Sequence, residues 1–140
     1  MKHLVEAFKM YGVAEVVGAK DNPEVIKLFD ELYFDGKVLK DETAWCAAFA
    51  NTILKRAGLP YQKTLNARSF LTLGKQVQDP QLGDIVVLWR ESRNSWKGHV
   101  GFYINQTEKH IYILGGNQGN QVKISAYPKH RLLQYRRVEK

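Results

Sequence analysis

The chain has 140 residues, 44% of them apolar and 25% charged, with a formal net charge of +7. These values predict one globular domain over residues 1–140, and no apolar run reaches the roughly 18 residues that a membrane-spanning helix needs. The basic balance favours an acidic partner such as nucleic acid, anionic lipid or a cell-wall polymer. A single cysteine and an N-terminus without an uninterrupted apolar stretch predict synthesis in the cytoplasm without a signal peptide.

Helices are predicted in the first half of the chain. Each begins at a capping residue and continues with apolar positions on one face. The three predicted helices cover residues 23–35, 44–57 and 67–73, with Asn22, Thr43 and Asn66 as their N-caps. The second helix ends at Gly58 and Pro60.

Short strands are predicted after Pro80. They are rich in β-branched and aromatic residues, are separated by turn residues, and cover 84–89, 99–104, 110–115, 121–126 and 131–138. The connections leave no room for crossover helices, so we expect a meandering antiparallel sheet of five strands. Helices followed by such a sheet predict an α+β fold.

Cys46 is the one cysteine, and it lies in the stretch ETAWCAAFANTIL at residues 42–54. With Thr43 as the N-cap, Cys46 is the third residue of its helix. Free backbone N–H groups and the helix dipole favour a thiolate there and should lower the pKa of the thiol. The residue is therefore either a nucleophile or a small core residue, which is the common fate of a free cysteine.

A thiol nucleophile needs a base, and His99 is the candidate among four histidines. His3, His110 and His130 are expected at the surface, whereas His99 opens an apolar strand in the phrase KGHVGFYI. The alternative for His99 is a structural hydrogen bond at a strand edge. A group that orients the base should lie on the neighbouring strand.

The stretch HIYILGGNQGN offers two candidates for the orienting group, Asn117 and Gln118. An amide oxygen can accept the imidazole N–H, as in Cys-His-Asn enzymes. The alternative is an ordinary Gly-Asn turn. The histidine and cysteine spacing fits no zinc site, and GGNQGN lacks the lysine of a phosphate-binding loop. Asp41, Glu42 and Asp84 are interpreted as polar residues at element starts.

Four blocks taken together resemble the NlpC- and CHAP-type cysteine peptidoglycan hydrolases. They are AWCAAF, PQLGDIVVLW, GHVGFYI and IYILGGNQ. The resemblance is closest to a small branch, associated with phages and bacteria, that carries WCAAF and LGGNQ blocks, and it covers nearly the whole chain. It implies a papain-like core with the catalytic cysteine at a helix N-terminus.

The resemblance also implies roles for individual residues. Cys46 would be the nucleophile and His99 the base, paired as thiolate and imidazolium. Asn117 is the first choice for the orienting residue and Gln118 the second. CHAP-type members often carry Glu two positions before the Asn, where this chain has Gly115. Asp84 would be structural, and the backbone N–H of Cys46 would donate to the oxyanion.

Two tryptophans are candidate substrate contacts beside these residues. Trp45 precedes the nucleophile, and Trp96 lies in the loop 91–98 that leads into His99. Either side chain could form a wall of a substrate groove. For Trp96, the alternative is that it covers the core.

The expected function is hydrolysis of an amide bond in peptidoglycan, as an amidase or as an endopeptidase, without a metal or organic cofactor. We expect a monomer that acts on the wall or in the periplasm after release or delivery. A delivery or immunity protein is a further expected partner, whereas nucleic acid and membrane insertion are not expected. One alternative is a non-catalytic basic module that binds a polyanion through residues 129–137. Another is a papain-like acyltransferase or deamidase.

Overall fold

The structure is a computed structural model that describes residues 2–13, 45–62, 64, 66–118 and 121–139. Its helices are α1 (Lys2–Lys9), α3 (Trp45–Arg56) and the 3-10 helices η1 (Ala67–Thr72) and η2 (Lys129–Arg131). Its strands are β1 (Lys75–Val77), β2 (Ile85–Trp89), β3 (Gly98–Gln106), β4 (His110–Gln118), β5 (Gln121–Pro128) and β6 (Leu132–Arg137).

All six strands form one antiparallel sheet in the order β1-β6-β2-β3-β4-β5. The predicted α+β class and antiparallel sheet are confirmed, and each of the five predicted strands corresponds to one of β2–β6. The prediction of five strands is wrong because it missed β1, which has only three residues and no buried side chain. The sheet is not a simple meander either, since β6 inserts between β1 and β2.

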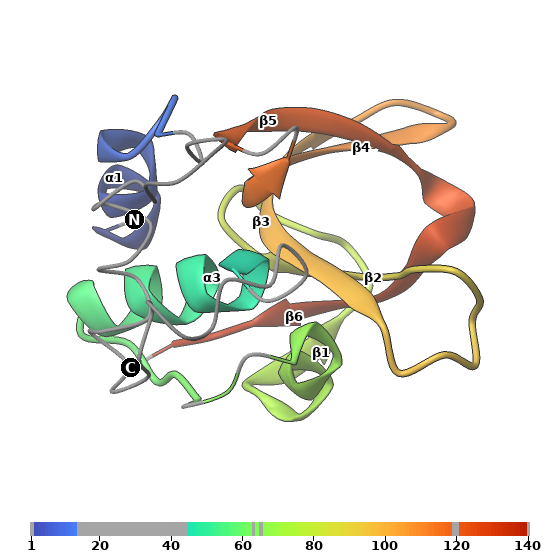
Figure 1. Cartoon of the computed structure of the whole chain (residues 1–140), viewed down its shortest axis with the longest axis horizontal. Helices are drawn as coiled ribbons and strands as arrows, with labels where there is room; N and C mark the ends of the chain where they lie inside the picture. The colour runs from blue at the N-terminus through green and yellow to red at the C-terminus, as the bar shows by residue number, and fades with distance from the viewer. Residues whose placement is uncertain (1, 14–44, 63, 65, 119–120, 140) are drawn as a thin grey trace, which may run out of the picture.

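Both faces of the sheet are buried, because alternate residues of a strand point to opposite sides. Val87 and Phe102 point toward α1 and α3 and belong to the larger apolar cluster. Leu88 and Tyr103, one residue along each strand, belong to a second cluster whose buried residues all come from strands. Figure 1 shows the sheet curling from β5 at the top to β6 below.

Helix α3 is the central helix and packs on β3 and β4 (Figure 1). Its first ten residues are all buried, and the alanines among them let the helix approach the sheet closely. It ends at Gly58, whose φ of 72° is in the left-handed region that favours glycine at helix ends. The predicted helix 44–57 is thus confirmed over its described part. No helix in the described part of the chain is long and apolar enough to cross a membrane.

Helix α1 is an element that the sequence pattern did not predict. It packs on α3, and His3 in its first turn is half-buried, with its Nε2 2.7 Å from the carbonyl oxygen of Gly83. The expectation that His3 faces solvent is therefore wrong. The predicted helix 23–35 and the N-caps Asn22 and Thr43 lie outside the described residues. Asn66 does cap η1, because its side chain accepts a hydrogen bond from the backbone N–H of Arg68.

Candidate active site

Cys46 lies in the first described turn of α3 and is almost fully buried. Backbone N–H groups of Ala47 and of Cys46 itself favour the thiolate, as does that of Val100, the residue after His99. Burial has the larger effect, because a buried thiolate loses its hydration, and the pKa of Cys46 is raised above 9.0. The prediction that the helix start lowers this pKa overall is therefore wrong, although the contacts that would lower it are present.

His99 is the second residue of β3 and is 6% exposed. It lies opposite Leu88 of β2, directly after Gly98. A Cβ atom on Gly98 would lie 2.9 Å from the carbonyl oxygen of Leu88, so the two strands approach closely only because this residue is glycine. Burial disfavours the imidazolium and lowers the pKa of His99 to about 4, even though the hydrogen bond that His99 donates to Gln118 acts in the opposite direction.

Gln118 fixes the tautomer of His99. The amide nitrogen of Gln118 donates to the carbonyl oxygens of Ile113, at 3.0 Å, and Lys123, at 2.6 Å. Its Oε1 is therefore the atom that lies 2.9 Å from His99 Nε2. An amide oxygen only accepts hydrogen bonds, so Nε2 carries the proton and Nδ1 is left with its lone pair.

The paired glycines before this amide provide the space that the site occupies. A Cβ atom on Gly115 would lie 2.7 Å from Gln118 Oε1. One on Gly116 would lie 2.7 Å from Phe49 Cβ and 2.9 Å from Trp45 Cζ3, both on α3. Gly115 thus leaves room for the amide that holds His99, and Gly116 leaves room for the helix that carries Cys46.

Tyr127 adjoins the histidine and Arg131 adjoins Tyr127, and neither was identified from the sequence. The Tyr127 hydroxyl lies 3.2 Å from His99 Nε2, with the two rings 5.1 Å apart. The guanidinium carbon of Arg131 lies 5.6 Å from the centroid of the Tyr127 ring. Arg90 and Arg131 both lower the pKa of His99 through their charge. Tyr127 lies one residue beyond the predicted strand 121–126, so the local pattern gave no signal for it.

Arg68 of η1 fixes the loop between β2 and β3 through hydrogen bonds. Its guanidinium donates to the carbonyl oxygens of Ser92, Arg93 and Lys97 at 2.8–2.9 Å. These three carbonyls come from both ends of the loop, and the strand that begins with Gly98 and His99 follows directly. Arg68 therefore ties the entry of the histidine strand to the helical side of the molecule.

The other predicted site residues lie in different surroundings. Trp96 is 67% exposed on the loop, whereas Trp45 is buried against Gly116, and its indole N–H has no hydrogen-bond partner among the described residues. Asn117 lies in β4, and its side chain is outside what the structure describes.

The structure describes one of the three acidic residues that the sequence places at element starts. Asp84 accepts hydrogen bonds from Arg137 and from the backbone N–H of Gln81. Asp41 and Glu42 lie outside the described residues.

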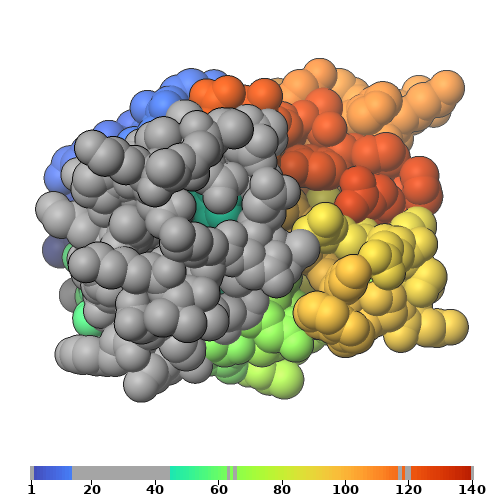
Figure 2. Space-filling view, in the orientation of Figure 1, coloured from blue at the N-terminus to red at the C-terminus, as the bar shows by residue number. Residues whose placement is uncertain are grey.

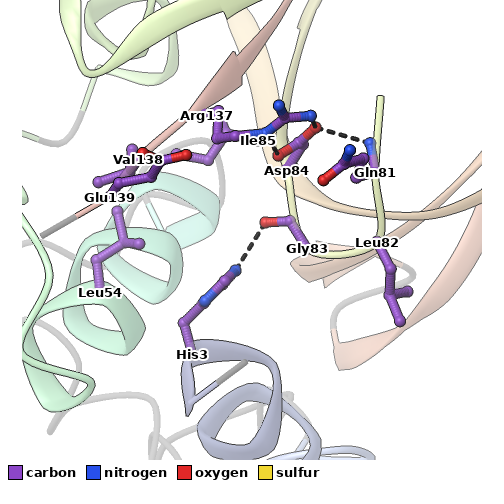
Figure 3. A pocket seen from close by; sticks show the side chains of 10 residues that line it. All are labelled: His3, Leu54, Gln81, Leu82, Gly83, Asp84, Ile85, Arg137, Val138 and Glu139. Atoms are coloured by element: carbon purple, nitrogen blue, oxygen red, sulfur yellow. Dashed lines mark hydrogen bonds and ion pairs between the residues drawn. The ribbon is translucent and has the colours of Figure 1, made fainter. Parts of the chain in front are cut away.

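A cavity of about 170 Å³ is not lined by Cys46 or His99 (Figure 3). It is lined by Leu54 in the C-terminal half of α3 and by Asp84 just before β2. Cys46 lies at the N-terminal end of α3, and His99 of β3 pairs with Leu88 near the far end of β2. His3 and the Asp84–Arg137 ion pair face it. Among the described residues, no group of three or more histidine, cysteine or acidic side chains could hold a metal ion.

Comparison with known families gives a match that covers more than half of the chain. The model of the CHAP domain matches residues 38–117. This range includes Cys46 and His99 and ends one residue before Gln118. No curated protein sequence matches the chain.

Proposed function

Because the chain belongs to the CHAP domain family, whose members are hydrolases that act on peptidoglycan, we propose that it cleaves an amide bond of the cell wall with Cys46 as nucleophile and His99 as base. The observation that carries this assignment is the hydrogen bond between His99 Nε2 and Gln118 Oε1 at 2.9 Å. It leaves Nδ1 as the nitrogen that can take a proton. The sulfur of Cys46 is meanwhile held against the backbone of Val100, the next residue of the same strand.

The proton moves during the attack in this proposal. With a raised pKa for Cys46 and a pKa of about 4 for His99, the resting pair at neutral pH is a thiol and a neutral imidazole. His99 Nδ1 takes the thiol proton as the sulfur attacks the substrate carbonyl, and the backbone N–H of Cys46 stabilises the oxyanion. The charged imidazolium that forms is stabilised by Gln118 Oε1.

The second half of the reaction reverses the proton transfer. The imidazolium donates its Nδ1 proton to the leaving amine, which departs and leaves a thioester on Cys46. His99, again neutral, takes a proton from a water molecule that attacks the thioester carbonyl. The acid is released and the thiol is restored. The bond cleaved is either that between muramic acid and L-alanine, as in an amidase, or one within the stem peptide or cross-bridge.

The proposed setting follows from the same assignment. The protein is made in the cytoplasm, acts on the wall or in the periplasm after release or delivery, and works as a monomer with a delivery or immunity protein as a further partner. Polyanion binding through residues 129–137 is less well supported. Arg137 in this segment pairs with Asp84, and Arg136 donates to the carbonyl oxygens of Leu73 and Gly74.

Digestion of purified sacculi tests the proposal. Wild type, Cys46→Ala and His99→Ala are compared after circular dichroism shows that each is folded, and the products are identified by mass spectrometry. We expect soluble fragments from the wild type and none above background from either variant, and the fragment masses identify the bond. Equal digestion by Cys46→Ala would exclude the proposed nucleophile.

A further inference from the structure

Two arginines beside the candidate active site, Arg90 and Arg131, have no acidic partner among the residues that the structure describes. Arg90 directly follows β2 and is half-buried, yet its guanidinium makes no hydrogen bond or ion pair with any described residue. The nearest acid in sequence, Glu91, pairs instead with Lys97 at 2.7 Å. Arg131 makes one side-chain hydrogen bond, from its Nε to the carbonyl oxygen of Trp89 at 3.1 Å. A half-buried cation without a counter-charge is costly unless a ligand supplies that charge.

Both arginines adjoin the groups proposed to react. Arg131 lies against Tyr127, whose hydroxyl is 3.2 Å from His99 Nε2. The backbone N–H of Arg90 donates to the carbonyl oxygen of Lys97 at 3.2 Å, two residues before His99. The charge of Arg90 also lowers the pKa of Cys46, His99 and Tyr127.

The two arginines come from segments that the fold brings side by side. Trp89, the residue before Arg90, contacts the segment that carries Arg131: its indole N–H donates to the carbonyl oxygen of His130 at 3.2 Å, and its ring centroid lies 5.9 Å from the Arg131 guanidinium carbon. Figure 2 shows the yellow surface of the β2–β3 region bordering the red surface of the chain near η2. Backbone and ring contacts of Trp89 therefore hold the segment that carries Arg131 against the end of β2, where Arg90 follows.

We propose that Arg90 and Arg131 form a subsite, which we call the carboxylate subsite, that binds a free carboxylate of the substrate close to the scissile amide. The inference rests on the proposed function and deepens it, because it specifies the chemistry that the substrate must carry. A guanidinium binds a carboxylate through paired, charge-assisted hydrogen bonds, and it loses them when the carboxylate is converted to an amide. Peptidoglycan stem peptides occur with a free or an amidated carboxyl group, so the subsite would select the free form.

Two matched substrates test this subsite. Once the fragments from sacculi identify the bond, two synthetic muropeptides are made around it that differ only in a free or an amidated carboxyl next to the scissile amide. We expect the wild type to cleave the free acid with a kcat/KM at least about tenfold higher, as for a hydrogen bond between charged groups. Binding of the same pair to Cys46→Ala should show the same preference without turnover.

Arg90→Gln is the variant that separates recognition from general electrostatics. If Arg90 binds the carboxylate, this change lowers kcat/KM for the free acid and has much less effect on the amide, and Arg90→Lys recovers part of the preference. If Arg90 acts only on the reacting groups through its charge, both substrates are affected equally. Arg93→Gln is the control, because it removes the same charge from an exposed position in the same loop.

The outcomes separate the two proposals. If the protein digests sacculi but cleaves the two muropeptides at equal rates, the carboxylate subsite is overturned and the hydrolase assignment stands. Equal effects of Arg90→Gln and Arg93→Gln on the preference would also overturn it. If the protein digests sacculi from no wall type, the proposed function is overturned. The carboxylate subsite depends on that function and would be overturned as well.

Discussion

Gln118 illustrates how one side chain defines the chemistry of its neighbour. Its amide makes three hydrogen bonds in fixed directions, and these determine which nitrogen of His99 carries the proton. Gln118→Ala should therefore lower kcat about 100-fold, the order of magnitude for a misplaced catalytic group. Imidazole ¹⁵N shifts should show the Nε2–H tautomer in the wild type and a mixture in the variant.

Asn117→Ala is the matched comparison, because it truncates the neighbouring amide. If Gln118 orients the histidine, Asn117→Ala keeps kcat near that of the wild type. The reverse result, with a large loss in Asn117→Ala and none in Gln118→Ala, would restore Asn117 as the orienting residue.

Burial of neutral His99 should appear in the pH dependence of stability. Its folded pKa of about 4 lies below the ordinary 6.5, so protons bind the unfolded chain more readily between these values. The stability contribution is present above pH 6.5 and is lost as the pH falls toward 4. We expect the free energy of unfolding to fall by about 2 kcal/mol between pH 7 and pH 5 because of this group.

Urea unfolding at the two pH values measures this loss. His99→Gln has no titrating group at the position and should show a smaller loss, while the other three histidines are common to both proteins. An equal loss in wild type and variant would show that His99 is not buried in its neutral form.

The sequence offered Cys46 and His99 as the candidate nucleophile and base but could not choose between Asn117 and Gln118 as the orienting residue. Cys46 and His99 sit in local patterns, a helix start and a strand start, that can be recognised without the fold. Which of two consecutive residues faces His99 depends on the strand register, and the register of β4 on β5 shifts between Gly115 and Gln118. A shift of one residue moves every side chain to the other face, so the choice required the structure.

At the scale of elements, η1 positions the histidine strand through Arg68. Three carbonyl oxygens of the β2–β3 loop accept its hydrogen bonds. Arg68→Ala should therefore loosen the loop and lower kcat by about tenfold through misplacement of His99. Hydrogen exchange should increase in residues 90–98.

Arg136→Ala is the control for Arg68→Ala. Arg136 donates to the carbonyl oxygens of Leu73 and Gly74, so its removal also costs hydrogen bonds between elements. Both variants should lose about 1–3 kcal/mol of stability. Faster exchange in residues 90–98 of both variants, or of neither, would contradict a specific role for Arg68.

Elements with a strong periodic pattern could be predicted, and those without one could not. The α3 helix and strands β2–β6 carry apolar patterns, caps or turn residues. Strand β1 is three residues long with exposed or half-buried side chains, so nothing in its composition distinguishes it from a loop. The residues that flank His99 in space, Tyr127 and Arg131, come from the far end of the chain, and local patterns do not report such contacts.

At the scale of the molecule, the ends of the chain meet away from the candidate active site. Around the cavity in Figure 3, His3 bonds to the carbonyl oxygen of Gly83, and Arg137 pairs with Asp84 through two hydrogen bonds of 2.9 and 2.7 Å. Asp84 is almost fully buried. This region therefore contributes to stability and lies away from the groups proposed to react.

Asp84→Asn should destabilise the fold without changing the chemistry. Loss of one partner of a largely buried ion pair is expected to cost about 3 kcal/mol, while kcat at a temperature where the protein is folded stays unchanged. Glu6→Gln removes an exposed ion pair with Lys9 and should cost less than about 0.5 kcal/mol. Thermal unfolding and sacculus digestion, measured on the same samples, check both expectations. A fall in kcat for Asp84→Asn would place Asp84 in the catalytic apparatus.

The position of β6 has a consequence for how the protein is made. This strand is the sixth in the chain but lies inside the sheet, between β1 and β2, and Arg136 bonds to Leu73 across 63 residues of sequence. During synthesis, Cys46 leaves the ribosome long before Arg137 does. The sheet therefore cannot close until β6 has also been synthesised, because that strand lies in its interior. Until then, β1 lacks the strand with which it pairs, and one edge of β2 is open.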